Sequence, residues 1–584
     1  MQKISLIDDP WIKVFDTRDY QNKTVSLAEL FANAQHYRQL TGDTHAQDLA
    51  VLRLLEAIAL TVYSRRDADG KPYEWLTLNE MDYPTVDEEK AAKQAPHDLL
   101  QTWQSLYQRG CFTEDVVKYL NHYRYAFSIG GDGGFCQVPV DVYNLLSRRN
   151  VPDEWSKSTT GTVVVKQINR RVSESNNSRA VFAAKSEQFV NRIELPELTR
   201  WLLAYQNYTG VTDKTKLDGV NDPVSKGWLY GFSPVYARGK NLFETLMLNL
   251  TLGLHDSAAS WMQKPVWEYD PKDYITHLVN KEQPVGTAEV YTSWARMLHV
   301  EWNDAMPDQP KIYTTGLPKL NDELIERELE PMAVWKWRDK DEVYKPFNHT
   351  LNNINQRMWR HFGLYFPTEQ DFSDQAEAHI REAGVVAWLK TLKRENVLPK
   401  NFVISLNTID LVDNGDSSSR MPAFEICDSL GLDADLAIDE QGMRTVERAI
   451  EFTNTVGKYY WHLASNLATL RTGSDDSGNA TRTAIINQTM NTFYDSLNDP
   501  FVKALHEWTS ANAEAQLKHY QDVVLSSVID ENVDALILSA APRDLIGKVD
   551  PETKQTVNLY TLINRFKATV NKYQKGMNSN ADND

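Results

Sequence analysis

Two adjacent residues, His255 and Asp256 in the stretch LGLHDSAAS, have the types and spacing that best fit metal chemistry. An imidazole and a carboxylate in adjacent positions can hold metal ions in a phosphohydrolase, where further His and Asp ligands come from other helices. Those further ligands cannot be picked out among 13 scattered histidines. Two interpretations of the pair stay open: a metal-dependent nuclease site, or a helix end capped by polar side chains.

Residues 127–139, FSIGGDGGFCQVP, form a glycine-rich segment of the kind that cradles phosphates in nucleotide-binding proteins. The dinucleotide pattern GxGxxG fails here because Cys136 stands where the third glycine is required. No strand and helix frame the segment either, so a flexible connector is the better interpretation. The sequence also lacks a GK[ST] phosphate loop, an HExxH zinc motif and a GxSxG nucleophile elbow. We expect no cofactor, and a binding protein rather than an enzyme.

Two segments carry positive charge in a chain whose net charge is −18. Long loops with a local reversal of charge are often functional, although some are disordered. Residues 224–240 add glycines and aromatic side chains to their cations, a mixture that suits contact with a nucleic-acid backbone and its bases. A turn-rich β segment with a solvated lysine explains the same residues. The first segment, residues 162–192, has six cations against Glu174 and Glu187: Lys166, Arg170, Arg171, Arg179, Lys185 and Arg192.

The elements that position these segments follow from hydrophobic periodicity. Residues 46–64 are apolar almost all round a helical wheel, which predicts a buried helix. From about residue 440, apolar residues recur at spacings of three and four, which predicts helices near 440–472, 480–508, 511–538 and 553–575. We therefore predict an α+β fold, with a large mixed domain over 1–438, a four-helix bundle over 439–575 and a disordered tail over 576–584.

The overall composition narrows the class of protein. A chain of 584 residues is too long for one hydrophobic core, and 42% hydrophobic residues with 24% charged residues are ordinary for a globular protein. No apolar run is long enough to span a membrane, and no secretory signal is visible, so we expect a cytoplasmic protein without a membrane partner. The acidic net charge argues against a protein that coats nucleic acid with its whole surface, but it permits a local basic groove.

An ordered set of short motifs resembles the CasA family, the large subunits of the type I-E CRISPR Cascade surveillance complex. The resemblance starts with SLIDDPWIKV, SLAELF and YRQLTGDTHAQDLAVLRLLEAIAL near the N-terminus. It continues with FCQVP at 135–139, SRAVFAAKS at 178–186, FSPVYARGKNLFETLMLNL at 232–250 and EPMAVW at 330–335. Each motif alone is weak, whereas the ordered set covers nearly the whole chain.

The resemblance implies a non-catalytic subunit of an RNA-guided antiviral complex. In such complexes the guide RNA reads the target by base pairing, and a protein reads only the short motif beside it. CasA is that reader, working through the minor groove, whose degenerate pattern tolerates several motifs. A wedge residue helps to open the duplex. The implied partners are the backbone, small and guide-capping Cascade subunits with CRISPR RNA, double-stranded target DNA, and the helicase–nuclease that CasA recruits.

The resemblance also implies site residues. The family's first loop, an aromatic followed by two small or polar residues, matches Phe182, Ala183 and Ala184, with Lys185 behind them. This loop contacts the complex core and the motif region in the family.

The next two family features are a glycine loop and a lysine finger. The glycine loop falls near residues 224–228, where Lys226 and Trp228 flank the single glycine, Gly227. The lysine finger precedes EPM and corresponds to Lys319, with Lys311 as the alternative.

The family's wedge is a glutamine between small or polar residues. The stretch SSSRMPAFE aligns Arg420 with that glutamine, between Ser419 and Met421. An arginine at this position adds attraction to the negative potential of the minor groove. Two other functions stay open beside this one: the metal-dependent nuclease with His255 and Asp256, and a scaffold that only bridges the other proteins.

Overall fold

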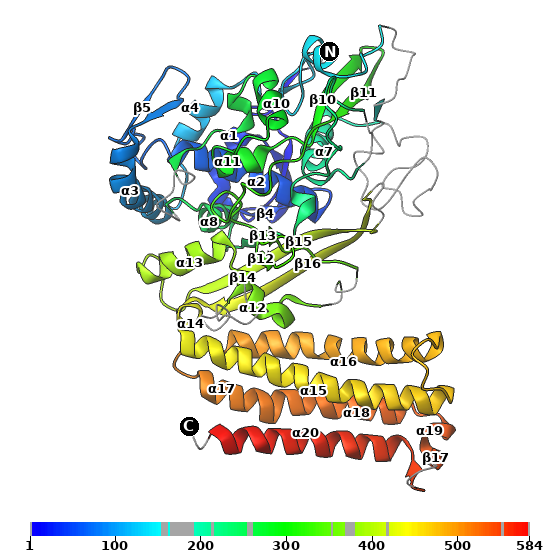
Figure 1. The fold of residues 1–584 in the computed structure, drawn as a ribbon. Helices are drawn as coiled ribbons and strands as arrows, with labels where there is room; N and C mark the ends of the chain where they lie inside the picture. The colour runs from blue at the N-terminus through cyan, green and yellow to red at the C-terminus, as the bar shows by residue number, and fades with distance from the viewer. Residues whose placement is uncertain are drawn as a thin grey trace. The chain divides into compact units, whose positions relative to one another are not determined.

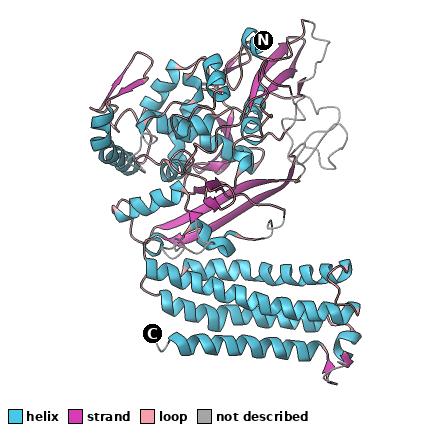
Figure 2. Cartoon of the chain, in the orientation of Figure 1, coloured by secondary structure: helices cyan, strands magenta, loops and turns pink. Residues whose placement is uncertain are grey.

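The computed structural model describes residues 3–153, 162–163, 192–211, 215–253, 261–351, 354, 356–367, 380–415, 420–549 and 554–581 (Figure 1). The chain divides into two compact units. Unit 1 comprises Met1–Ile354, Glu369–Leu398 and Ile404–Ser429, and unit 2 comprises Asn355–Thr368, Pro399–Val403 and Leu430–Asp584. The division places most of the strands in the first unit and the long C-terminal helices in the second (Figure 2). The predicted α+β class is confirmed.

Unit 1 begins with a small antiparallel sheet in the order β3-β2-β4, formed by Ile12–Asp16 (β2), Gln21–Val25 (β3) and Tyr37–Leu40 (β4). Burial alternates along β2, and its apolar residues Ile12 and Val14 are buried. Ser26 then caps helix α1 (Leu27–Asn33), because its side chain accepts a hydrogen bond of 3.1 Å from the Glu29 backbone N–H.

Helix α2 (His45–Tyr63) lies in the core of unit 1, as its apolar composition predicts. Thr44 caps it by accepting a hydrogen bond from the Gln47 backbone N–H. The helix packs against α7 (Leu195–Tyr208) and α11 (Thr287–Thr292), and even its Arg53 and Glu56 side chains are fully buried. A buried charge is tolerated only where it is paired or neutral, so α2 is the element around which the polar core must be organised.

Two three-stranded antiparallel sheets carry the segments of functional interest. Strand β10 (Arg296–Asn303) pairs with β11 (Met306–Gly316), which also pairs with β8 (Thr162–Val163). The second sheet has the order β16-β15-β9, with β9 (Val235–Ala237), β15 (Val403–Asp413) and β16 (Pro422–Asp433). Because β9 runs antiparallel to β15, the segment before β9 lies beside the C-terminal end of β15.

The remaining elements of unit 1 surround these sheets and α2. Another three-stranded sheet has the order β13-β12-β14. The bounds are β1 Ile4–Ser5, η1 Ala34–His36, β5 Leu76–Leu78, β6 Pro84–Val86, α3 Glu88–Arg109, α4 Asp115–His122, β7 Ser128–Ile129, α5 Val140–Leu146, η2 Leu229–Gly231, α8 Leu242–Asn249, η3 Val266–Glu268, α10 Pro271–Val279, β12 Trp335–Arg338, β13 Val343–Pro346, β14 Ile380–Arg381 and α13 Gly384–Arg394.

Unit 2 contains the long helices that the periodicity predicts. Helix α15 (Glu440–Thr472) packs against α16 (Ala480–His506), α17 (Ala513–His519) and α20 (Leu559–Ala581). Tyr460 of α15 stacks on Phe493 of α16 with ring centroids 4.3 Å apart, and its edge meets Phe566 of α20. Residues of α15 thus bury aromatic surface against two neighbours, which stabilises the unit as a whole.

The third predicted helix differs from a continuous α-helix. It consists of α17, a π-helical turn η6 (Tyr520–Val524) and α18 (Leu525–Leu538). The π turn directs Tyr520 into the core, where its hydroxyl lies 2.7 Å from the Thr453 hydroxyl of α15. A single π turn inside an α-helix accommodates one additional residue. The spacing of apolar residues by three and four positions does not reveal such an insertion.

Short elements and the helical C-terminus complete unit 2. The short elements are η4 Met358–His361, α12 Phe362–Tyr365, α14 Ala434–Ala437, α19 Pro542–Ile546, β17 Lys548–Val549 and β18 Thr556–Val557. Helix α20 continues to Ala581, so residues 576–581 are helical where we expected a disordered tail. An established helix extends easily, since each added residue gains one backbone hydrogen bond.

Candidate nucleic-acid interface

Asp413, the last residue of β15, lies between two of the predicted DNA-binding cations. The Arg420 guanidinium lies 3.3 Å from one carboxylate oxygen of Asp413, and the Lys226 ammonium lies 3.8 Å from the same oxygen. Lys226 and Arg420 are 194 positions apart in the printed sequence, so only the fold brings them together. The structure therefore places one residue of the predicted glycine loop and the predicted wedge at a single site.

The geometry of the β15–β16 turn determines how Arg420 is presented. The Asn414 backbone N–H donates a 2.9 Å hydrogen bond to the Met421 carbonyl, which joins the two ends of the turn. Met421 is buried, whereas the Arg420 side chain is 39% exposed. Arg420 also has a left-handed backbone with φ of +50°, a conformation that non-glycine residues adopt rarely and often at functional sites. The turn thus holds Arg420 outward beside its buried neighbour.

Lys226 is held more tightly than a surface lysine. Its ammonium lies 5.2 Å from the centre of the Tyr230 ring, in addition to its contact with Asp413. Burial lowers the pKa of Lys226, and the carboxylate of Asp413 partly opposes this shift. The positive charges of Arg420 and Lys319 lower the pKa further. We call Lys226, Lys319 and Arg420 the cation cluster, because the charges of Arg420 and Lys319 both act on Lys226.

Lys319 is the most accessible member of this cluster. It follows the C-terminal end of β11, and its side chain is 55% exposed. Its ammonium pairs with the carboxylate of Asp322 three residues later. An exposed ion pair of this kind contributes little to stability, so a phosphate can replace Asp322 as the partner at small cost.

Gly227 occupies a position where the backbone approaches a neighbouring helix closely. Its N–H donates a 2.9 Å hydrogen bond to the Thr209 carbonyl just after α7. A Cβ atom on Gly227 would lie 2.2 Å from the Asn207 carbonyl oxygen, a distance that real structures do not tolerate. Glycine is therefore required here by packing, and the fixed backbone positions Lys226 on one side and Trp228 on the other.

Trp228 points toward the protein interior. Its indole N–H donates a 2.7 Å hydrogen bond to the Glu330 carboxylate, which is fully buried. Glu330 also forms a bidentate ion pair with Arg53 of α2, with both N–O distances at 2.8 Å. Removing one partner of such a buried pair costs about 3–5 kcal/mol. Trp228 thus anchors the loop to the polar core, and its indole N–H is already engaged.

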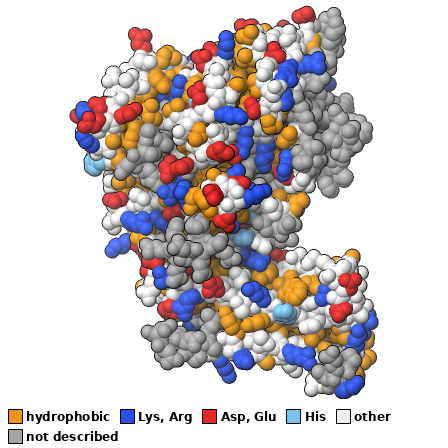
Figure 3. All heavy atoms as spheres, viewed as in Figure 1, with side chains coloured by type: hydrophobic (Ala, Val, Ile, Leu, Met, Phe, Trp, Pro, Cys, Tyr) orange, Lys and Arg blue, Asp and Glu red, His pale blue; other side chains and the backbone are white. Residues whose placement is uncertain are grey.

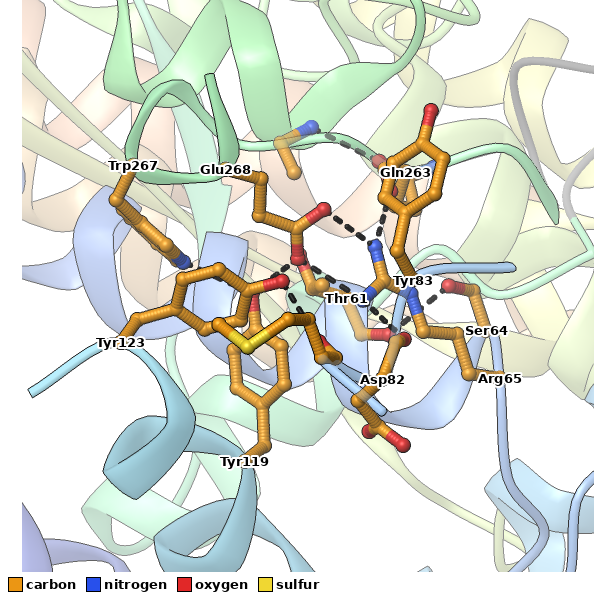
Figure 4. A network of polar contacts seen from close by, with 12 residues as sticks. Thr61, Ser64, Arg65, Asp82, Tyr83, Tyr119, Tyr123, Gln263, Trp267 and Glu268 are labelled. Atoms are coloured by element: carbon orange, nitrogen blue, oxygen red, sulfur yellow. Dashed lines mark hydrogen bonds and ion pairs between the residues drawn. The ribbon is translucent and has the colours of Figure 1, made fainter. Parts of the chain in front are cut away.

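A second buried arginine network stabilises the other end of α2 (Figure 4). The Arg65 guanidinium makes two 2.9 Å hydrogen bonds to the Glu268 carboxylate and one of 2.8 Å to the Asp82 carbonyl. The Tyr119 hydroxyl donates to the same carboxylate and accepts a 2.8 Å hydrogen bond from the Trp267 indole. Burial raises the pKa of Glu268, and Arg65 opposes that shift. Most polar atoms of this network are paired within the protein, although Arg65 Nε has no partner among the described residues, and the network has a structural role.

Three polar side chains underlie the interface without forming a catalytic triad. Ser233, His349 and Asp410 are all buried, and the His349 Nδ1 atom lies 2.9 Å from both the Ser233 hydroxyl and the Asp410 carboxylate. A hydrolytic triad requires the base to contact the nucleophile and the acid through different ring nitrogens. Here both partners meet the same nitrogen, so the three residues connect β15 to the segment before β9.

Several predicted site residues lie outside the described residues. These are Phe182, Ala183, Ala184, Lys185, Ser419, His255 and Asp256. Among the residues that the structure describes, no group of three or more His, Cys, Asp and Glu side chains could hold a metal ion. Side chains of both charges are interspersed on the face of the molecule that Figure 3 shows.

The shared carboxylate of Asp413 is the feature that the sequence did not reveal. Asp413 ends an apolar strand and precedes a polar turn, which alone suggests a turn residue. Hydrophobic periodicity also cannot indicate that Tyr230 contacts Lys226 or that Asp322 pairs with Lys319. Chemically, the arrangement offers cations with replaceable carboxylate partners, which suits binding of a phosphate backbone.

Comparisons with known proteins identify the family. The family described as CRISPR-associated protein Cse1 matches residues 5–530, which is most of the chain. The chain belongs to this family. No curated protein matches it in sequence.

Solved structures share the fold along nearly the whole chain. Cse1 of Thermobifida fusca has a TM-score of 0.70 and 21% identity, with 98% of each chain covered. CasA of Thermus thermophilus has a TM-score of 0.65 and 17% identity, with 98% of this chain and 99% of that chain covered. A chain of a structure described as a CRISPR RNA-guided surveillance complex has a TM-score of 0.62 and 13% identity, with 98% and 100% covered. Among the described residues, no helix is long and apolar enough to cross a membrane.

Proposed function

We propose that this chain is the large subunit of a CRISPR RNA-guided surveillance complex and reads the short motif beside the target in double-stranded DNA. Membership of the Cse1 family supports the role as a subunit of such a complex, and one of the similar structures is described as a CRISPR RNA-guided surveillance complex. The observation that carries the DNA-binding part is the pairing of Lys226 and Arg420 with Asp413, together with the positive charge of Lys319 acting on Lys226.

In this proposal the three cations contact DNA where it enters the complex. Phosphates replace Asp322 and Asp413 as partners of Lys319 and Lys226, so the exchange conserves ion pairs and releases counterions. Arg420, presented by the left-handed turn, enters the minor groove and acts as the wedge at the first target base pair. Unstacking costs a few kcal/mol, which pairing with the guide RNA offsets.

The remaining parts of the proposal concern the assembly. Residues 182–185 dock the chain onto the backbone, small and guide-capping subunits that hold the CRISPR RNA. Residues 439–575 form a four-helix bundle that contacts the small subunits and the DNA. The chain is non-catalytic and recruits a helicase–nuclease that degrades the opened target. The acidic net charge of −18 fits a subunit whose guide-bearing partners supply most of the positive surface.

A gel-shift titration tests the proposal directly. Purified guide-loaded complex lacking its large subunit is mixed with duplex target, with and without this chain, while the three bases beside the target are varied at fixed salt. We expect the chain to restore tight binding for only some of these motifs. Equal restoration for every motif would make the chain a scaffold and would contradict minor-groove reading.

A further inference from the structure

Helix α20 of unit 2 carries a row of cations that no neighbouring carboxylate balances. Residues 559–575 of this helix contain four cations and neither aspartate nor glutamate, in a chain whose net charge is −18. One of the four, Lys567, pairs with Asp530 of α18 at 2.7 Å. The other three are exposed, and within the described part of the chain none of them forms a salt bridge. We call these three, Arg565, Lys572 and Lys575, the α20 stripe.

Packing against α15 determines which face of α20 is exposed. On the buried side, Phe566 meets Tyr460 of α15 edge-on with ring centroids 5.5 Å apart, and Tyr573 stacks on Phe452 of α15 at 5.4 Å. Each residue advances about 100° around an α-helix and about 1.5 Å along it. The three cations of the α20 stripe therefore fall within an arc of about 80° and span about 15 Å of the helix. Figure 1 shows α20, drawn in red, along one edge of the long-helix unit.

The rest of the exposed face is polar and includes one aromatic side chain. Asn564 and Asn571 are exposed on it, and asparagine side chains donate hydrogen bonds to phosphate oxygens in protein–DNA complexes. Tyr560 is 49% exposed and lies about 7.5 Å along the helix axis from Arg565. An exposed aromatic ring near unpaired cations is typical of single-strand binding, because bases stack on the ring while the cations contact the backbone.

The charge of the α20 stripe selects a polyanion, and the remaining chemistry of the face selects the kind of polyanion. A helix that lies on a membrane inserts an apolar face among the lipids, whereas the apolar face of α20 is buried in unit 2. An acidic protein surface would engage the three cations but would leave Tyr560 unused. A single nucleic-acid strand engages both, since it offers phosphates to the cations and an unpaired base to the ring.

We propose that the α20 stripe binds single-stranded DNA without regard to its sequence, with the three cations on phosphates and a base stacked on Tyr560. This inference rests on the proposed function, in which the chain helps to open a duplex and so frees a strand. The stripe shares no residue with the cation cluster of unit 1, which contacts the duplex in that proposal. Its affinity comes largely from counterion release, so it falls steeply as the salt concentration increases.

Fluorescence anisotropy of the full chain with a labelled oligothymidylate of about 12 nucleotides tests the proposal. The stripe variant combines Arg565→Gln, Lys572→Gln and Lys575→Gln, and glutamine keeps the helix propensity of the residues that it replaces. Each phosphate contact on a single strand contributes about 0.7 to the slope of log K against log[salt]. We therefore expect the magnitude of the slope to fall by about 2 in the stripe variant.

A matched control variant removes three exposed cations from other helices of unit 2. It combines Lys458→Gln, Lys503→Gln and Lys518→Gln on α15, α16 and α17, and we expect it to keep the slope of the unaltered chain. Tyr560→Ala tests the stacking contact separately. We expect it to weaken oligothymidylate binding by at least about fivefold with an unchanged salt slope.

Three results would overturn the proposal. The first is absence of saturable oligothymidylate binding by the unaltered chain up to about 100 μM, the weak end of non-specific binding, which would leave an acidic protein surface as the partner. The second is an equal loss of slope in the stripe and control variants. The third is equally tight binding of a duplex of the same length with the same dependence on the stripe.

The motif-selective gel shift of the assembled complex separates this inference from the proposed function. We expect the stripe variant to keep the preference among the three bases beside the target, because the cation cluster is unaltered. Equal restoration for every motif by the unaltered chain, with oligothymidylate binding intact, would contradict motif reading alone. Motif selectivity with no effect of the stripe variant on oligothymidylate binding would overturn the α20 site alone.

Discussion

At the scale of single residues, the cations of the candidate interface are distinguished by their partners. Arg420 and Lys226 share Asp413, whereas Lys319 has its own carboxylate in Asp322. The two carboxylates offset two of the three positive charges, so the site keeps a net positive charge without DNA. A bound phosphate backbone releases counterions in proportion to the number of cations that it engages.

The first prediction concerns Arg420 and Lys319. We expect Arg420→Ala and Lys319→Ala to weaken binding of duplex target by the assembled complex without affecting assembly. Loss of a phosphate contact lowers the salt slope, d log K/d log[salt], by about 1, whereas loss of a base contact costs about 1–3 kcal/mol at one motif position. Gel-shift titrations at several salt concentrations and motifs distinguish these effects.

Matched controls for these variants exist in unit 1. Lys93 is an exposed lysine paired with Glu89, and Arg124 is 48% exposed and paired with Asp8. Lys93→Ala and Arg124→Ala should leave target binding unchanged. Unchanged affinity in both Arg420→Ala and Lys319→Ala would remove these residues from the DNA site.

The second prediction concerns Gly227. An alanine there places Cβ against the Asn207 carbonyl, so the backbone must shift and carry Lys226 with it. We expect Gly227→Ala to lower the free energy of unfolding by about 1–3 kcal/mol, the usual cost of overpacking, and to weaken target binding. Thermal unfolding and gel-shift titration measure the two effects.

Gly363→Ala is the control for this substitution. Among the described residues, no neighbouring atom lies within 4 Å of the position that a Cβ atom on Gly363 would take, and its φ is not positive, so alanine fits there. The control should unfold at an unchanged or slightly higher temperature, since alanine is the better helix former. If Gly227→Ala matched this control in both melting temperature and target binding, the close approach to α7 would be unimportant.

The types of the interface residues were predictable from sequence, but their shared partner was not. Lys226 stands out because it lies in a segment of positive charge, and the resemblance to the family selects Lys319 and Arg420. Asp413 is one of 80 acidic residues, and its role depends on a sheet that joins segments almost two hundred positions apart. Roles for Phe182, Ala183, Ala184, Lys185 and Ser419 remain predictions.

At the scale of elements, a histidine links two helices of unit 1. His277 in the last turn of α10 lies 3.0 Å from Glu289 of α11 and 2.9 Å from Glu282. The nearby Glu289 carboxylate raises the pKa of His277, and Glu282 adds to the shift. The protonated imidazole therefore holds α10 and α11 together.

The third prediction follows from the sign of this shift. A folded-state pKa above the ordinary value of about 6.5 gives stabilisation that is complete below about pH 6.5 and is lost as the pH rises through the raised pKa. His277→Gln cannot gain this charge. The difference in unfolding free energy between the unaltered protein and His277→Gln should therefore shrink as the pH rises from 5.5 to 9.

Chemical unfolding at several pH values measures this difference. His97→Gln is the control, because His97 is 80% exposed on α3. Its effect on stability should stay small across the whole range. A constant difference for His277→Gln at every pH would show that protonation of His277 does not connect the two helices.

Helices were the most predictable elements. Strong periodicity located α2, α15 and α16 to within a few residues, because burial of an apolar face determines where such helices lie. The pairing of β15 with β9 was not predictable, since sheet pairing depends on long-range register. The glycine-rich segment was interpreted as a flexible connector, yet its residues are fixed by specific backbone hydrogen bonds.

At the scale of the whole molecule, the net charge of −18 weakens the attraction of DNA to the few cations of the candidate interface. Duplex DNA that approaches the free chain meets repulsion from most of its surface, and only a few cations are gathered at one site. Length and composition predicted more than one core, and the chain does divide into two compact units.

The fourth prediction concerns the isolated chain. We expect it to bind duplex target no more tightly than typical non-specific binding, with a dissociation constant of about 10⁻⁴–10⁻⁶ M at physiological salt. Affinity should fall as salt increases and should not depend on the motif until the guide-loaded partners are added. Fluorescence anisotropy with labelled duplexes measures this, and nanomolar motif-selective binding by the free chain would contradict it.

The π-helical turn at Tyr520–Val524 gives the third long helix of unit 2 one more residue than a regular α-helix would have over the same length. Buried Leu517 and Leu525 are eight positions apart, which would place them about 80° apart on a regular α-helix but about 20° apart after the loss of one residue.

The fifth prediction is that deleting exposed Val523 converts the turn to α-helix with little change in melting temperature. Deleting exposed Glu531 instead should rotate buried Asn532 and Val533 by about 100° and destabilise the protein. The turn is thus a place where the length of this helix can change during evolution without disturbing its packing.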